Sequence, residues 1–176
     1  MISFNYLASP GQLGNQMFKY AALKGISHEL NTTLLMPPSY NVERFKPVFK
    51  MLKKFNLIDH RNYNNHSLFK YFKMESVKKN NIGYSDLEIS ITEDSFEFDP
   101  KFFSSEIKSF DVYGFFQSYK YFENIKNDLI RDFTFKDEIQ SKSKLIYNNL
   151  DNPISIHVRR GDYLVNPNHN VLELDY

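Results

Sequence analysis

Two adjacent arginines follow an apolar run near the end of the chain. The run covers residues 154–158, and Arg159, Arg160, Gly161 and Asp162 come directly after it. Such a run predicts a short buried strand that ends at the glycine. Ligand sites in open α/β sheets lie at the carboxyl ends of strands, and arginine binds phosphate oxygens through paired hydrogen bonds. The pattern therefore predicts a grip on a phosphorylated ligand, with Asp162 orienting an arginine or reaching a sugar hydroxyl.

The same residues allow two other interpretations. Adjacent arginines on a surface turn are commonly solvated, and exposed ion pairs contribute at most about 1 kcal/mol. Arg160-Gly161-Asp162 also spells a cell-adhesion tripeptide, but that role requires an exposed loop on a secreted protein, and the sequence shows neither a secretion signal nor cysteines for disulfides, which argues against it. His157 lies two residues before Arg159, so on a strand both point to the same side. Its imidazole is either a nucleotide contact or a hydrogen-bonded core histidine.

A second candidate site lies at the other end of the chain. Residues 1–7 roughly alternate apolar and polar side chains, which predicts a strand. Residues 8–16 form a turn-rich break with one proline and two glycines, and apolar residues then recur at helical spacing. Unpaired N–H groups at a helix N-terminus bind anions, so this strand–turn–helix corner is a candidate anion-binding site. Glycine at such a corner also serves purely steric needs.

These segments resemble a known family of enzymes. His-x-Arg-Arg-Gly-Asp-Tyr at residues 157–163 resembles the donor-site signature of fucosyltransferases that use GDP-fucose, and its ending resembles the α-1,2-fucosyltransferases, glycosyltransferase family 11. Residues 11–21 resemble the family's opening Gly-Gly-Leu-Gly-Asn-Gln-Met-Phe-Gln-Tyr-Ala, with Gln12 and Lys19 where a glycine and a glutamine are usual. Residues 96–100 and 112–122 resemble two further family elements in the same order.

The resemblance implies an α/β fold of the GT-B type, in which two Rossmann-like domains face each other. Residues 1–150 would be the N-terminal, acceptor-side domain. Residues 151–176 would hold only the first strand and the start of the nucleotide-sugar-binding domain. Family members continue well beyond this point, so the chain is expected to be a truncated product, a fragment or half of a split reading frame. Little or no turnover is then expected from these 176 residues alone.

The implied reaction moves L-fucose from GDP-fucose to the 2-hydroxyl of a terminal galactose, with inversion at the sugar carbon. Arg159 would be the catalytic residue, because positive charge on the departing pyrophosphate lowers the barrier. No catalytic base stands out, and no metal or other cofactor is implied. The implied donor-binding residues are Gly14, Asn15, His157, Arg159, Arg160 and Asp162. The alternatives are a transferase for another GDP-sugar and an inactive truncated paralogue.

Composition narrows the class of protein without identifying it. The chain has 41% apolar and 16% aromatic residues, which is ample for a core, and a net charge of +1, which offers no basic field for nucleic acid. It has no cysteine, so disulfides and thiol chemistry are absent, and its histidines lack metal-ligand spacing. No apolar run reaches the ~20 residues that span a bilayer. A cytoplasmic protein is expected, with peripheral attachment to the inner face of the membrane through residues 50–54 as a minor alternative. The family resemblance implies that its acceptor would be a galactose-terminated glycan such as a lipopolysaccharide O-antigen.

The remaining elements follow from hydrophobic periodicity and from helix stop signals. Further strands are predicted at residues 33–36, 87–91 and 109–113. Helices are predicted at residues 16–30, 119–133 and 136–149, with a shorter one at 48–55. Strands that alternate with helices indicate a parallel α/β sheet.

Overall fold

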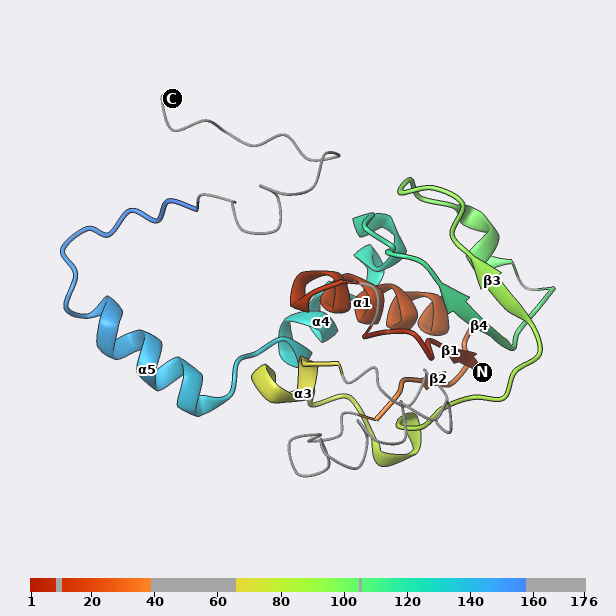
Figure 1. Ribbon diagram of the computed structural model, residues 1–176, viewed down its shortest axis with the longest axis horizontal. Helices are drawn as coiled ribbons and strands as arrows, with labels where there is room; N and C mark the ends of the chain where they lie inside the picture. Colours follow the sequence, from red (N-terminus) through yellow and green to blue (C-terminus); the bar gives the residue numbers. More distant parts are fainter. Residues whose placement is uncertain (9–10, 39–65, 105, 158–176) are drawn as a thin grey trace, which may run out of the picture. The chain divides into compact units, whose positions relative to one another are not determined.

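Four short strands form a parallel sheet. They are β1 (Ile2–Ser3), β2 (Leu34–Leu35), β3 (Ser90–Thr92) and β4 (Phe110–Tyr113), in the spatial order β2-β1-β4-β3 (Figure 1). Each neighbouring pair runs parallel, which confirms the parallel α/β arrangement expected from the sequence. The computed structural model describes residues 1–8, 11–38, 66–104 and 106–157. The chain divides into two units, residues 1–139 and 140–176, and the sheet belongs to the first.

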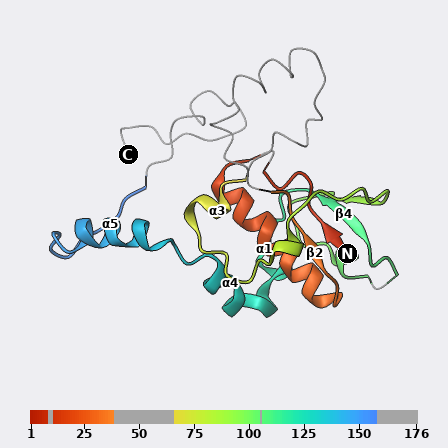
Figure 2. The ribbon, with the colours of Figure 1, turned by 90° about the horizontal axis from the view of Figure 1, so that it is seen from below.

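One long helix connects the first two strands of the chain. Helix α1 (Leu13–Glu29) begins three residues before the predicted start, because the Gln12 carbonyl already accepts the Gln16 N–H at 3.1 Å. Its apolar side chains share one core with those of the sheet. Two 3₁₀ turns, η5 (Tyr119–Tyr121) and η6 (Glu123–Ile125), also contact α1. The helix lies among other elements and is buried on several faces (Figure 2).

The alternation of β1 and β4 separates an apolar face of the sheet from a polar one. Ile2 pairs with Phe110, and both are buried in the core. The next pair, Ser3 and Asp111, points to the other face, where the Ser3 hydroxyl donates to the Asp111 carboxylate at 2.7 Å. Asn5 continues this polar face and donates its side-chain amide to the Ser85 carbonyl at 2.9 Å. Hydrogen bonding thus satisfies the polar groups that this face buries.

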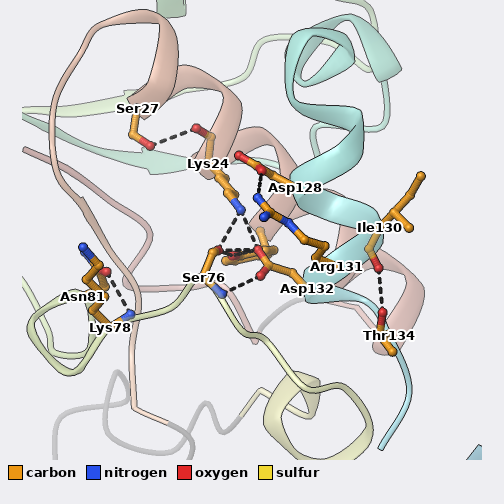
Figure 3. Close-up of polar contacts among 11 residues, drawn as sticks. Lys24, Ser27, Ser76, Lys78, Asn81, Asp128, Ile130, Arg131, Asp132 and Thr134 are labelled. Atoms are coloured by element: carbon orange, nitrogen blue, oxygen red, sulfur yellow. Dashed lines mark hydrogen bonds and ion pairs between the residues drawn. The ribbon is translucent and has the colours of Figure 1, made fainter.

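A buried carboxylate joins α1 to helix α4 (Lys126–Asp132). Asp132 is fully buried and accepts from the Lys24 ammonium and the Tyr20 hydroxyl, each at 2.6 Å. Ser76 adds two more bonds, from its hydroxyl at 2.6 Å and from its backbone N–H at 2.8 Å. Figure 3 shows Lys24 and Ser76 converging on this carboxylate. Burial alone would raise the pKa of Asp132, but these hydrogen bonds outweigh it and hold the pKa below its ordinary value.

The prediction of one helix at residues 119–133 needs correction. The segment is the two turns η5 and η6 followed by the short helix α4, because the irregular backbone at Phe122 interrupts it. Of its apolar residues, Ile125 and Leu129 are buried, whereas Ile130 is 60% exposed. The Leu68–Tyr84 stretch, for which no element was predicted, contains helix α3 (Leu68–Tyr71) and the turn η3 (Lys79–Asn81).

Other elements fall near their predicted places. The strand expected at residues 87–91 is the three-residue β3, and η4 (Pro100–Phe103) follows it with its first turn capped by the Asp99 side chain. The helix expected at residues 136–149 is α5 (Asp137–Tyr147). The short helix expected at residues 48–55 lies outside the described residues. Within the described ranges, no helix combines the length and the apolar character needed to span a bilayer.

The strand predicted before the arginine pair is wrong for its described part. Residues 153–157 have no strand assignment, and Ile154 and Ile156 are 89% and 83% exposed. A strand is stabilised by hydrogen bonds to a neighbouring strand and by a covered apolar face. No described residue supplies either of these to the segment, so its apolar pattern alone does not bury it.

Candidate functional site at the carboxyl edge of the sheet

The segments that follow β1, β3 and β4 gather at one edge of the sheet. Because the strands are parallel, their carboxyl ends share that edge, which is where ligand sites of open α/β sheets lie. The start of α1 follows β1, Glu93 follows β3, and residues 114–117 follow β4. These three segments bring the polar side chains of the candidate site together.

An amide pair joins two of these segments. The Gln117 side-chain amide donates to the Asn15 side-chain carbonyl at 3.0 Å. Gly11 makes room for this pair, since its φ is +114° and a Cβ there would overlap the Asn15 side chain. Each amide has two donors and one carbonyl acceptor, so a single mutual bond leaves further hydrogen-bonding capacity on both side chains. The pair is therefore suited to binding the hydroxyl groups of a sugar or the oxygens of a phosphate.

Glu93 holds the backbone that carries Gln117. One of its carboxylate oxygens accepts the N–H groups of Phe115 and Phe116 at 2.7 and 2.9 Å. Phe116 has φ +53°, a conformation that costs a bulky residue about 1–3 kcal/mol. Gly114 lies against Glu93, and a Cβ there would come within 2.5 Å of the Glu93 Cβ. The turn after β4 thus depends on a glycine and on a carboxylate from the neighbouring strand.

A lysine is buried beneath this turn. Lys19 of α1 has no exposed surface, and its ammonium lies 5.5 Å from the centre of the Phe4 ring and 5.3 Å from that of Phe115. Burial lowers its pKa to about 8, against the opposing attraction of Glu93. Lys19 is still mostly protonated at neutral pH, so a cation and a carboxylate flank the turn from two different elements.

The edge also has a small hollow of about 200 Å³ beside Glu93. Its walls come from the ends of β3 and β4 and include both carboxylates and aromatic rings: Thr92, Glu93, Asp94, Ser95, Phe96, Tyr113, Gly114 and Phe115. A larger hollow of about 660 Å³ lies between α1 and α4, but its walls are almost wholly apolar. The smaller hollow has the larger share of polar groups of the two, and polar groups are what orient a hydrophilic ligand.

Only two of the predicted site residues lie at the carboxyl edge of the sheet within the described part of the chain. Gly14 is exposed in the first turn of α1, and Asn15 beside it contacts Gln117, so both lie at the carboxyl edge. His157 belongs to the second unit, where it is exposed and outside any strand. The interpretation of His157 as a buried core histidine is therefore wrong. Arg159, Arg160 and Asp162 lie outside the described residues.

Sequence reasoning missed two residues of this site. Lys19 carried a usable signal, since it stands where the resembled family commonly has glutamine. Glu93 carried none beyond its place after a short strand, because its partners are 22 and 23 residues away in the chain. Residues that meet only through a sheet cannot be paired from local spacing.

Within the described residues, no group of three His, Asp or Glu side chains is arranged to hold a metal ion. His66 is 1% exposed, and its Nε2 lies 2.8 Å from the Pro37 carbonyl. Burial lowers the pKa of His66 to about 4, although the bond to Pro37 opposes this shift. His66 is thus a neutral structural histidine at physiological pH.

The fold is that of an α/β protein with a parallel sheet, and polar side chains gather at the carboxyl ends of its strands. Comparison with known families is more specific. The sequence model described as Glycosyl transferase family 11 matches residues 2–175, so the chain belongs to that family and is a glycosyltransferase. No curated protein and no solved structure matches the chain. Sugar donors and glycan acceptors are the general substrates of such enzymes.

Proposed function

We propose that the protein is an inverting fucosyltransferase that moves L-fucose from GDP-fucose to the 2-hydroxyl of a terminal galactose in a glycan. The observation that carries this proposal is the family match over residues 2–175, a range that includes the His-x-Arg-Arg-Gly-Asp-Tyr segment. The polar edge of the sheet adds a second surface able to bind hydroxyl or phosphate oxygens.

The proposed chemistry depends on managing charge. When GDP leaves, negative charge grows on the pyrophosphate, and fixed donors aimed at it stabilise the transition state. Arg159 supplies this charge through bidentate contacts, with Arg160 and Asp162 as supporting residues and His157 contacting the nucleotide. An arginine in this role makes a bound metal unnecessary, so we propose a metal-independent reaction.

We assign Gly14 and Asn15 to the donor as well. Both lie in the first turn of α1, where backbone N–H groups lack acceptors within the helix and the helix dipole favours negative charge. The Asn15 amide, held by Gln117, adds a side-chain donor at the same place. This arrangement binds a leaving phosphate or a sugar hydroxyl without any ionisable group.

The acceptor and the cellular setting are part of the proposal. A galactose-terminated glycan such as a lipopolysaccharide O-antigen fits an enzyme of the cytoplasm that works at the inner face of the membrane. Peripheral attachment would require only a short basic stretch, such as residues 50–54.

The test is transfer from GDP-fucose to N-acetyllactosamine, with the product linkage assigned by NMR and EDTA present in a parallel reaction. Arg159→Ala is expected to abolish transfer and to weaken GDP-fucose binding measured by saturation-transfer NMR. Arg131→Ala is the matched control, because Arg131 is a largely exposed arginine of α4. Preference for GDP-mannose, a linkage other than to the 2-hydroxyl, or full transfer by Arg159→Ala would each contradict the proposal.

A further inference from the structure

Glu93 is anchored by the sheet before its side chain makes any contact. In the register of β3 with β4, Thr92 pairs with Tyr113, and the Glu93 N–H donates to the Tyr113 carbonyl at 2.8 Å. Glu93 therefore continues the ladder by one residue, directly opposite the turn that begins at Gly114. Its Cβ position is set by the sheet and not by a loop.

From this anchored position the carboxylate fixes two consecutive backbone N–H groups. A charged acceptor makes shorter and stronger hydrogen bonds than a neutral one, and the contacts to Phe115 and Phe116 measure 2.7 and 2.9 Å. They close the turn in which Phe116 adopts positive φ. The Phe116 ring is fully buried, and it packs edge-on against Phe4 at 5.6 Å between ring centres.

The remaining groups around the carboxylate complete its environment. Its second oxygen is buried and accepts no hydrogen bond from the described residues. The Lys19 ammonium, which attracts Glu93, lies against the Phe115 ring on the α1 side. The neighbouring Asp94 is exposed and forms an ion pair with Lys101 at 2.5 Å, so its cationic partner is a different lysine from the one near Glu93.

Gln117 follows this clamped turn by one residue. Its side chain reaches Asn15, which is 102 residues earlier in the chain. The direction in which Gln117 leaves the turn is determined by the backbone of the two preceding residues, and Glu93 holds both of them. Removing the carboxylate frees that backbone while leaving Gln117 and Asn15 chemically intact.

We propose that Glu93 is a positioning residue for sugar transfer, which holds the Gln117 side chain against Asn15 by binding the backbone of Phe115 and Phe116. This inference rests on the proposed function, because it assigns Asn15 to the reaction. In this role Glu93 acts through the backbone that it holds and not by contact with the substrate. Its contribution is geometric, and misplacement of a reacting group by about 1 Å can cost roughly 100-fold in rate.

The experiment is a double-mutant cycle with Glu93→Ala, Gln117→Ala and the double variant, measured as kcat and as KM for GDP-fucose. We expect each single variant to lose at least tenfold in kcat with little change in KM. The double variant should be no slower than Gln117→Ala, because both changes remove the same geometry. Glu93→Gln keeps an oxygen acceptor and should recover part of the loss. Glu88→Ala, which removes an exposed carboxylate just before β3, is the matched control.

A second readout does not require turnover. In ¹⁵N-labelled protein, the side-chain amide signals of Gln117 and Asn15 should shift together in Glu93→Ala and stay in place in Glu88→Ala. Unchanged amide signals in a folded Glu93 variant, or a double variant whose loss equals the product of the single losses, would overturn the positioning role. Preference for another GDP-sugar over GDP-fucose would count against the proposed function, while the amide signals would decide the role of Glu93 whether or not these 176 residues catalyse transfer. If Glu93→Ala fails to fold, Glu93→Gln provides the same two comparisons.

Discussion

The side-chain amides of Asn15 and Gln117 are hydrogen bonded at 3.0 Å across the carboxyl edge of the sheet, although 102 residues separate them. One residue stands in the first turn of α1 and the other follows β4. Their meeting turns two separate sequence segments into one polar site. It also joins Asn15, which the family resemblance assigns to binding of the sugar donor, to Gln117 of the family element at residues 112–122.

The first prediction concerns this amide pair. Asn15→Ala and Gln117→Ala should each lower the rate of transfer at least tenfold. Asn15→Asp should lower the rate further, because the new carboxylate would repel the phosphates of the donor. The measurement is GDP release in the presence of acceptor. Asn127→Ala, an exposed change on α4, should leave the rate unaltered. Equal rates for Asn15→Ala and Asn127→Ala would exclude Asn15 from the reaction.

The second prediction concerns Lys19, whose pKa burial lowers from 10.5 to about 8. Between about pH 8 and 10.5 the unfolded chain holds a proton on this lysine that the folded chain has released. The contribution of Lys19 to the free energy of folding therefore becomes more favourable as pH rises through this window. Below pH 8 the full free-energy cost of burying its charged ammonium is present. The free energy of unfolding in urea should be measured at pH 7.5 and pH 10 for both proteins. Relative to Lys19→Gln, the unmodified chain should be more stable at pH 10 than at pH 7.5.

The control for this pH effect is Lys126→Gln on α4, where the lysine is exposed. Its stability should follow that of the unmodified chain across the same window, because this change leaves the buried Lys19 in place. If Lys19→Gln and Lys126→Gln give parallel curves, the burial of the Lys19 charge has no energetic consequence.

The third prediction concerns the buried network at Asp132. Asp132→Ala should destabilise the fold by about 3–5 kcal/mol, because it leaves the Lys24 ammonium and the Tyr20 hydroxyl buried without their shared acceptor. Urea unfolding followed by circular dichroism measures the loss. Asp128→Ala, whose side chain forms an exposed pair with Arg131 on the same helix, should cost less than about 1 kcal/mol. Similar losses from both changes would show that the buried network adds nothing specific.

The fourth prediction concerns acid unfolding at His66. Burial lowers its pKa to about 4, whereas an ordinary histidine has the value 6.5. Between these pH values the unfolded chain therefore binds more protons than the folded chain. The contribution of neutral His66 to the free energy of unfolding is fully present above about pH 6.5 and declines as the pH falls toward 4. The full span amounts to on the order of 3 kcal/mol. Denaturation midpoints measured from pH 7.5 to pH 4.5 should fall for the unmodified chain.

The comparison for His66 uses two variants. His66→Gln should flatten this pH dependence, while the exposed His28→Gln should keep it. A slope that is the same in all three proteins would assign the acid sensitivity to other groups, such as the carboxylate of Asp132.

Local pattern and tertiary structure made separate contributions to the fold. Alternation in residues 1–7 and helical spacing after Gln16 located β1 and α1, because both periodicities are properties of neighbouring residues. The same reasoning failed at Ile130 and at Ile154, which are apolar and exposed. Whether an apolar residue is buried depends on what covers it, and that information is not local.

The sequence by itself determined the family, since contiguous motifs such as residues 11–21 and 157–163 are read without any structure, and residues 2–175 match as a whole. It also determined the parallel α/β class through the alternation of strands and helices. Only the tertiary structure decided that Glu93, Lys19 and Gln117 share a site with Asn15. Parallel pairing brings the ends of β1, β3 and β4 to one edge, and contacts made through a sheet leave no trace in the spacing of residues along the chain.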